Sequence, residues 1–345
     1  MKRDDSVTIS KAIGIILMVI GHSGLGGHLT SFIYLFHMPL FFFLSGYCFK
    51  ENYIYSPKVF FKKRIEGVYF PYIKWAILFL LFHNIFEKCY FYSDTYSVGQ
   101  YLKHLTTIVL AMKGEEQLLG GFWFLNTLFW GAIIFYVMKK IFSFHYGLKI
   151  GGALLLCFCI VFNAFSLRIP FWGINDKIFL AAFFMLIGNV LSHKKITLTP
   201  IVITIGVGFM LLGTFFWHQQ MLSLKCKTII PYTITAVIGS YLTLYLVRRI
   251  KWTNFRYLYT IFLYIGNNTL VIFIWHFLSF KIVSLLVILL YNFPISRMSE
   301  FPVVNDIPNK GWWFAYSMIG VCFPLVINKS INLAKVLFLK VIGNK

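Results

Sequence analysis

Three ionisable side chains near the amino terminus lie inside apolar runs, where they could do chemistry. Lys11 and His22 stand in a run that reads ISKAIGIILMVIGHSG, and His37 stands in a second run that reads IYLFHMPLFFFLSGYCFK. Ionisable groups at membrane depth are costly, so each is a functional candidate by default. A neutral imidazole can accept a proton from a hydroxyl group or attack a carbonyl carbon, and a lysine ammonium binds anions.

The spacing of Lys11 and His22 predicts that they share one face of a helix. Eleven residues correspond to about 1100° of rotation, close to three turns, and to roughly 16 Å along the helix axis. That face would carry a cation at one end and an imidazole at the other. An alternative stays open for Lys11, because a lysine can extend its stem along apolar surface and place its ammonium at the membrane interface.

The elements that must position these groups are transmembrane helices. The chain has 345 residues, of which 59% are hydrophobic and 12% charged, whereas a soluble domain carries about 25% charged residues. We therefore predict an all-α, polytopic membrane protein that forms a single membrane domain over residues 1–345. Apolar runs of about 17–24 residues predict about ten transmembrane helices, at approximately 9–25, 31–49, 69–87, 122–139, 149–166, 177–192, 199–217, 229–247, 268–291 and 311–328.

The distribution of basic residues predicts the orientation. With the amino terminus in the cytoplasm, 20 of the 32 lysines and arginines fall in cytoplasmic segments, nine fall on the opposite side and three fall within spans. Both termini would then be cytoplasmic, and the longest loop, 88–121, would face out. Residues 101–112 of this loop are too few to span, so they would lie flat or re-enter the membrane. The net charge of +21 thus reflects topology and anionic lipid headgroups, not nucleic acid.

The motif that ends in Gly21-His22, with Lys11 before it, resembles the amino-terminal signature of the acyltransferase 3 family, and more narrowly its fucose 4-O-acetylase-like branch. The likeness spans nearly the whole chain. Many members carry Arg where Lys11 stands; a lysine keeps the charge but lacks the planar fork that binds phosphate through two hydrogen bonds. Many members also carry Asp where this chain has Thr8. The other segments that agree with the family are Phe36 to Tyr47, Arg64 ahead of Phe70-Pro71-Tyr72, Trp123-Phe124-Leu125, and Gly266-Asn267-Asn268-Thr269 leading to His276.

The resemblance implies an integral membrane O-acyltransferase of the bacterial cell membrane. Its donor would be cytoplasmic acetyl-CoA or another acyl-CoA, with no tightly bound cofactor, and its acceptor a hydroxyl of a cell-surface glycan or a lipid-linked saccharide. Catalysis would fall to His22, supported by His37, and donor binding to Lys11 and Arg64.

Three further residues are candidates for the acceptor path. The resemblance implies pore-lining roles for Trp123 and His276, although an interfacial anchor and a helix-to-helix hydrogen bond are their ordinary alternatives. Asp176 stands just before an apolar run, where it would orient an acceptor hydroxyl or a histidine, or would be an ordinary loop carboxylate. Pro39 lacks a backbone donor, which would leave a carbonyl free to bond His37 and to set its tautomer.

Absent motifs limit the alternatives. The sequence has no Walker motif, no HExxH, no Cys/His spacing of a metal site and no Gly-x-Ser-x-Gly elbow, so we expect no metal; Ser45-Gly46-Tyr47 is predicted to be a packing motif. The main alternative is a polysaccharide exporter or transporter, since intramembrane His and Lys also mark substrate and proton paths. Duplicated halves, which would favour a transporter, are not visible. A succinyltransferase of an exopolysaccharide, with the same machinery, is the third reading.

Overall fold

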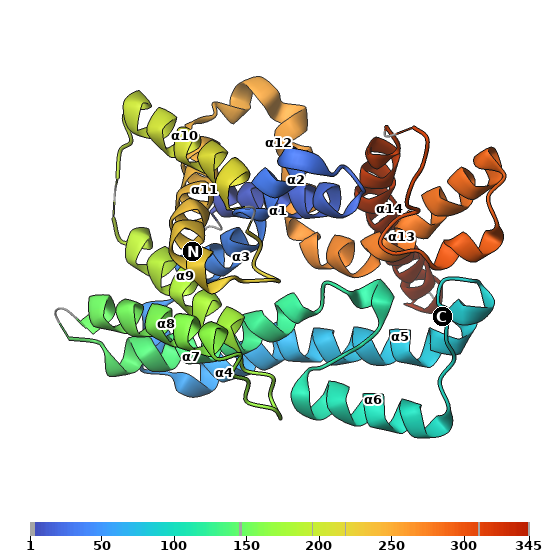
Figure 1. The fold of residues 1–345 in the computed structure, drawn as a ribbon, viewed down its shortest axis with the longest axis horizontal. Helices are drawn as coiled ribbons and strands as arrows, with labels where there is room; N and C mark the ends of the chain where they lie inside the picture. Colours follow the sequence, from blue (N-terminus) through green and yellow to red (C-terminus); the bar gives the residue numbers. More distant parts are fainter. Residues whose placement is uncertain (1–3, 145–146, 195, 218, 310, 344–345) are drawn as a thin grey trace. The chain divides into compact units, whose positions relative to one another are not determined.

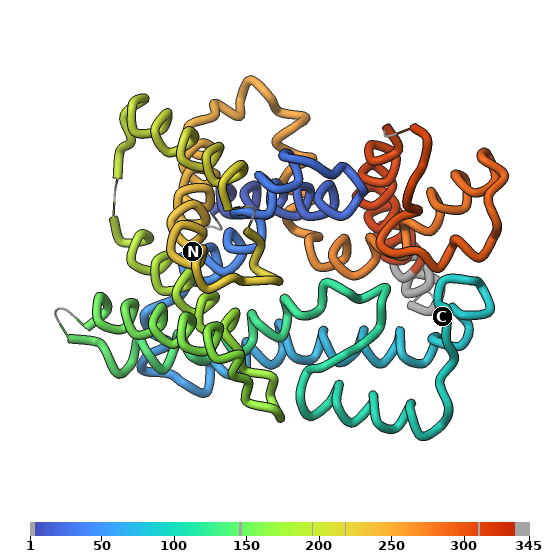
Figure 2. The backbone as a smooth tube through the Cα atoms, viewed as in Figure 1, coloured from blue at the N-terminus to red at the C-terminus, as the bar shows by residue number. Residues whose placement is uncertain are grey.

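The computed structural model describes residues 4–144, 147–194, 196–217, 219–309 and 311–343. Over these residues the chain forms helices and no β-strand (Figures 1 and 2), which confirms the all-α fold. Residues 1–3, 195 and 344–345, some of which the orientation argument counts as cytoplasmic, lie outside the described residues. The chain divides into two compact units, described here separately: Met1–Leu25, Ile85–Thr95 and Ile250–Lys345 form the first, and Gly26–Asn84 and Tyr96–Arg249 form the second.

All ten predicted apolar segments coincide with helices. Two of them are α9 (Asp176–Ser192) and α10 (Pro200–Phe216), each of 17 residues. Within the described residues, eight helical stretches are long and apolar enough to cross a membrane, as expected of a polytopic protein. These are α1 (Asp5–His22), α2 and α3 (Gly27–Tyr47), α4 and α5 (Pro57–Lys88), α7 (Trp123–Ile141), α8 (Gly147–Ala164), α11 with the turn before it (Cys226–Arg249), α13 (Thr269–Tyr291) and the part of α14 from Trp312 to Ala334.

The segment predicted as one helix over 31–49 is two helices, α2 (Gly27–Tyr34) and α3 (His37–Tyr47). In a continuous helix the ring of Pro39 would collide with the carbonyl group four residues earlier. The chain avoids this collision by breaking before the proline, where Phe36 takes a non-helical φ of −142°. Pro39 thereby falls in the first turn of α3, where a missing N–H breaks no helical hydrogen bond.

The helix predicted over 69–87 begins earlier than expected. α4 (Pro57–Arg64), a π-helical turn (Ile65–Tyr69) and α5 (Phe70–Lys88) follow one another without a break. Single π-helical turns inside α-helices are frequent at functional sites. This one directly follows Arg64, one of the predicted donor-binding residues.

The short apolar segment of the longest loop forms α6 (Val98–Ala111). The hydroxyl of Tyr69, next to the start of α5, donates to the carbonyl oxygen of Val109 at 2.6 Å, near the end of α6. Tyr96, just before α6, stacks on His83 toward the end of α5. α6 therefore runs antiparallel to α5, which favours re-entry beside this span over a helix that lies flat across it.

Backbones of α3 and α9 touch at two glycines. A Cβ atom on Gly46 would lie 1.8 Å from the carbonyl oxygen of Met185, and one on Gly188 would lie 2.0 Å from the carbonyl oxygen of Phe43. Small residues allow transmembrane helices to approach closely, so that dispersion and weak C–H···O contacts hold them together. This contact confirms a packing role for Gly46, the middle residue of Ser45-Gly46-Tyr47.

The first unit also depends on a close glycine contact. A Cβ atom on Gly266 would lie 2.0 Å from the carbonyl oxygen of Thr8, so this glycine lets α12 touch α1. α12 lies between the predicted spans 229–247 and 268–291, and it packs along the first half of α1. The helices of this unit are α1, α12 (Arg256–Asn267), α13 and α14 (Trp312–Gly343).

We predict that Gly188→Ala lowers the thermal midpoint of the purified chain, because overpacking at the α3–α9 contact costs about 1–3 kcal/mol. Gly208→Ala on α10 is the matched control, since among the described residues no atom beyond its chain neighbours and its own helix backbone lies within 4 Å of the added Cβ. This control should leave the midpoint unchanged or raise it, because Ala exceeds Gly in helix propensity by up to about 1 kcal/mol. Melting curves in one detergent make the comparison, and equal midpoints for the two variants would contradict the close packing.

Candidate active site

Two imidazole rings meet at the end of α1. His22 is the last residue of α1, and His276 lies two turns into α13. Their ring centres are 5.7 Å apart and their planes differ by 28°, so the rings are stacked. Phe277 packs against both, with its ring centre 5.1 Å from that of His22 and 3.9 Å from that of His276. The structure thus brings together two residues that are far apart in the sequence.

His276 is held in one tautomer. Its side chain is wholly buried, and its Nδ1 lies 2.9 Å from the carbonyl oxygen of Phe273. A carbonyl oxygen only accepts, so Nδ1 carries a proton, and in the neutral ring Nε2 then has the free lone pair. Nε2 is buried and has no hydrogen-bond partner among the described residues. A buried acceptor in this state is costly and calls for a functional explanation.

His22 differs from His276 in being partly exposed. Of the two residues, it is therefore the less buried. His276 contributes a packed second ring behind it. This arrangement suits a proton acceptor at His22 whose orientation the stacked ring maintains.

Lys11 shares the helix that carries His22. α1 is a continuous α-helix from Asp5 to His22, so the eleven-residue spacing does place both residues on one face, roughly 16 Å apart along the axis. The lysine side chain is half-buried. α1 therefore presents a cation and an imidazole along one line.

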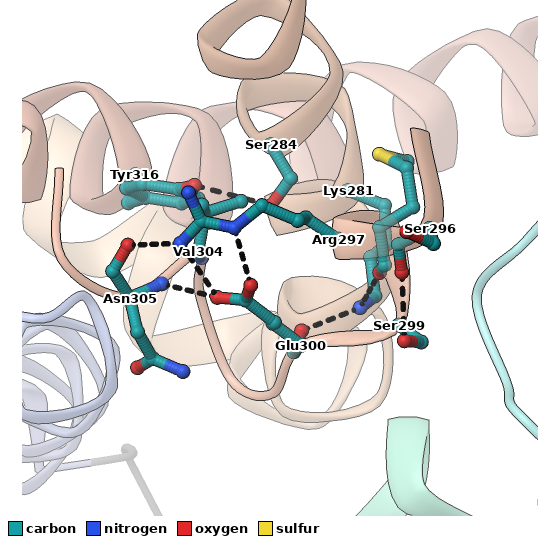
Figure 3. A network of polar contacts seen from close by, with 10 residues as sticks. Lys281, Ser284, Ser296, Arg297, Ser299, Glu300, Val304, Asn305 and Tyr316 are labelled. Atoms are coloured by element: carbon teal, nitrogen blue, oxygen red, sulfur yellow. Dashed lines mark hydrogen bonds and ion pairs between the residues drawn. The ribbon is translucent and has the colours of Figure 1, made fainter. Parts of the chain in front are cut away.

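Two phenylalanines, Phe277 of α13 and Phe301 of the loop between α13 and α14, form an aromatic wall beside the histidine pair. The ring of Phe301 packs on that of Phe277 with 4.6 Å between their centres. The buried ammonium of Lys281 donates to the carbonyl oxygens of Met298 at 2.5 Å and Glu300 at 2.9 Å, as Figure 3 shows for the loop between α13 and α14. A lysine inside the span thereby fixes the backbone that carries Phe301.

The side chain of Glu300 also stabilises this loop (Figure 3). Its carboxylate accepts from Arg297 Nε at 2.5 Å and from the backbone N–H of Asn305 at 2.5 Å. Partial burial raises the pKa of Glu300, but these hydrogen bonds lower the pKa by more, so it lies below its ordinary value. The carboxylate is consequently charged at neutral pH. The hydroxyl of Tyr316 adds a contact to Ser284 at 3.1 Å.

His37 belongs to the second unit and is buried there as the first residue of α3. Its Nδ1 lies 2.9 Å from the carbonyl oxygen of Ile33, and its ring lies beside that of Tyr34 with 5.2 Å between centres. Nδ1 must donate to this carbonyl, so a neutral ring again has its lone pair on Nε2. The expectation of a carbonyl that sets the tautomer is met, but the carbonyl lies in the last turn of α2 and is not one released by Pro39.

Arg64 links two helices of the second unit. Its Nη1 donates to Ser45 Oγ of α3 at 3.3 Å, and its guanidinium lies 5.3 Å from the ring centre of Phe60. The neighbouring Lys62 and Lys63 are exposed, whereas Arg64 is half-buried. Arg64 therefore differs from these exposed neighbours, because it is partly buried at the π-helical turn and bonded to another helix.

Asp176 and Trp123 lie in the second unit as well. The Asp176 carboxylate accepts from Asn163 Nδ2 at 2.7 Å, and the same amide donates to the carbonyl oxygen of Leu224 at 3.0 Å. These bonds join the end of α8, the start of α9 and the loop before α11. Trp123 is half-buried and is the first residue of α7. Acceptor-path roles for both residues stay predictions.

Sequence reasoning missed the aromatic wall formed by Phe277 and Phe301. The one signal that pointed to it was Lys281, an ionisable residue inside the most apolar span. Nothing local in the sequence indicated which loop this lysine would bind. Among the described residues, no three His, Cys, Asp or Glu side chains gather as metal ligands.

A comparison with protein families bears on the chemistry of this pair. A family model described as an acyltransferase domain, that of acyltransferase 3, matches residues 4–329. No curated protein and no solved structure matches the sequence. The matched range includes the stacked histidines, Lys11 and every other predicted site residue. Because the match covers most of the chain, this protein belongs to the acyltransferase 3 family of membrane acyltransferases.

Proposed function

We propose that this acyltransferase is an O-acetyltransferase that moves an acetyl group from cytoplasmic acetyl-CoA to a hydroxyl of a cell-surface glycan or its lipid-linked precursor. The observation that carries the proposal is the stacked pair of His22 and His276 at the end of α1. The donor and acceptor classes rest on the resemblance to the fucose 4-O-acetylase-like branch.

His22 is the general base in this proposal, because it is half-buried whereas His276 is wholly buried. Its ring nitrogen removes the proton of the acceptor hydroxyl while the hydroxyl oxygen attacks the thioester carbonyl carbon. The tetrahedral intermediate then loses the C–S bond, and the imidazolium returns the proton to the departing CoA thiolate. A route through an acyl-histidine would use the same ring as the nucleophile. His276, which is wholly buried, acts as a positioning residue.

Lys11 binds the phosphates of the donor in this scheme. It lies roughly 16 Å from His22 on the same face of α1, which suits a donor whose phosphates and thioester are separated by the long pantetheine arm. Arg64 is the second donor-binding residue. Its position at the π-helical turn and its bond to Ser45 hold the guanidinium in place.

We infer that both termini face the cytoplasm, from the excess of basic residues in the segments assigned to that side. The assignment of basic residues to two sides assumes that successive spans cross the membrane in alternate directions. Contacts in the second unit support this assumption. Glu51, after α3, accepts from Lys139 at the end of α7 at 2.7 Å and from His193 after α9 at 3.1 Å. Partial burial raises the pKa of Glu51, but its hydrogen bonds lower the pKa by more, so the carboxylate stays charged at neutral pH. Three helices therefore end on one side.

The topology predicts which residues a membrane-impermeant thiol reagent reaches. In a background without native cysteines, Asp94→Cys should be labelled in intact cells, because loop 88–121 faces out. Lys251→Cys should be labelled only after the membrane is opened. Both positions are exposed in the structure, so burial does not interfere. Labelling in the reverse order would contradict the proposed orientation.

Lys11→Ala should weaken acetyl-CoA binding by roughly 10- to 100-fold, the effect of losing a hydrogen bond to a charged group. Lys11→Arg should retain most of the affinity, because the cation is kept. Lys74→Ala is the matched control, since Lys74 is a lysine of another span and should change the affinity less than the Lys11 variant. Isothermal titration of the purified chain measures the three. Equal affinities for wild type and Lys11→Ala would refute the assignment.

His22→Ala should lose about 10²–10⁴ of the transfer rate, the usual effect of removing a general base. His37→Ala should keep residual turnover, and His28→Ala, a control whose ring packs on Phe215, should keep nearly all. The assay is acetylation of the native glycan at matched membrane levels. If His22→Ala retains more than roughly a tenth of the wild-type rate, this mechanism is wrong. Movement of unacetylated glycan across vesicles without any acetylation would favour a transporter.

A further inference from the structure

A basic cavity lies in the second unit, at the carboxyl-terminal ends of α3, α9 and α11 (Ile229–Arg249). Its volume is about 530 Å³. We call it the α3–α9–α11 cavity. Three cationic and three aromatic side chains lie in its lining, namely Lys194, Arg248, Arg249, Tyr47, Tyr241 and Tyr245.

The two guanidinium groups are held by tyrosine hydroxyls. Arg248 Nη1 donates to the hydroxyl of Tyr47 at 2.9 Å, and its guanidinium lies 5.2 Å from the centre of that ring. Arg249 Nη2 donates to the hydroxyl of Tyr245 at 2.9 Å. Arginines that serve only to set topology need no fixed geometry. These two are oriented in advance, which reduces the entropy cost of binding a ligand.

The opposite wall of the cavity is fixed to α11 as well. The hydroxyl of Tyr245 donates to the carbonyl oxygen of Leu198 at 3.1 Å and accepts from its backbone N–H at 3.2 Å. The hydroxyl of Tyr241 donates to the carbonyl oxygen of Ile196 at 3.2 Å. Ile196 and Leu198 are thereby tied to α11 by hydrogen bonds.

The charge of the cavity points to an anion. Among the described residues that line it, none is acidic. Glu51 lies near the ends of α3, α7 and α9. Its carboxylate already accepts hydrogen bonds from Lys139, Asn189 and His193. Guanidinium groups bind phosphate oxygens through paired, charge-assisted hydrogen bonds. A lysine ammonium and tyrosine hydroxyls add further donors.

We propose that the α3–α9–α11 cavity binds a phosphate group, carried by the headgroup of an anionic lipid or by the nucleotide end of coenzyme A. The chemistry is the same for both sources: the two guanidinium groups and the Lys194 ammonium neutralise the phosphate. Only the nucleotide source rests on the proposed function, because it would make the cavity part of the donor site. A lipid source requires no acyl transfer.

The test compares two double variants of the full chain, purified in a neutral detergent. Arg248→Gln/Arg249→Gln removes both guanidinium groups of the cavity. Lys58→Gln/Lys140→Gln is the control, since it removes two charges from exposed positions outside the cavity lining. Lys194→Gln provides a milder variant should the first prove unstable, and thermal midpoints establish that each variant is folded.

Two probes distinguish the sources. Isothermal titration with coenzyme A measures nucleotide binding, and native mass spectrometry with added phosphatidylglycerol, against phosphatidylcholine, measures anionic lipid binding. We expect the arginine variant to lose roughly tenfold or more in affinity for one of the two phosphate probes, since hydrogen bonds to charged groups are lost. The affinity should also fall with added salt.

The binding results show whether the cavity binds phosphate and from which source. Loss of phosphatidylglycerol binding with coenzyme A binding intact identifies a lipid site, and the reverse identifies a nucleotide site. Affinities for both probes that match those of the control variant overturn the proposal. A wild-type chain that binds coenzyme A at this cavity but transfers no acetyl group would contradict the proposed function and leave the phosphate site standing.

Discussion

Polar groups inside a membrane have no water to bond, and this constraint governs the described chain from its helices to its site. The ammonium of Lys281 meets it by donating to two carbonyl oxygens of the loop after α13. His37 meets it by donating to the last turn of α2, and Lys139 by pairing with Glu51. In each case the acceptor is a loop or a helix end. Satisfying the polar group therefore also fixes a piece of backbone that hydrophobic packing alone would leave free.

His276 departs from this pattern, because its Nε2 is buried without a partner among the described residues. Its Nδ1 bond to the carbonyl oxygen of Phe273 fixes the ring, so the ring cannot turn the Nε2 lone pair toward a hydrogen-bond donor. The neighbouring His22 is partly exposed and stacks on it. In the proposed mechanism the two rings have different roles, since the half-buried His22 would meet the substrate and the buried His276 would hold it in place. The Phe277 and Phe301 wall keeps the apolar side of this pair closed.

Close backbone contacts set the distances on which the polar features depend. Helices in lipid gain little from apolar burial, so glycines that admit a neighbouring backbone are decisive. Gly46 and Gly188 bring α3 and α9 together, and Gly239 receives the side chain of Phe36 at the α2–α3 break. These contacts draw the ends of α3, α9 and α11 toward one another. Tyr47 and Arg248 can then meet, which forms one side of the basic cavity.

Features that repeat along the chain were determined by the sequence itself. Hydropathy located ten apolar segments that coincide with helices, although only eight helical stretches of the described residues are long and apolar enough to cross a membrane. The eleven-residue spacing placed Lys11 and His22 on one face of α1. Both features depend on local periodicity alone. Pro39 contained the reason for the break in the second segment, although the segment was predicted as one helix. The pairing of His22 with His276, the grip of Lys281 on its loop and the antiparallel course of α6 depended on tertiary structure. The same holds for the basic cavity, since the positive-inside rule accounts for each arginine taken singly. Contacts between distant segments decide such features, and no local pattern encodes which segments will meet.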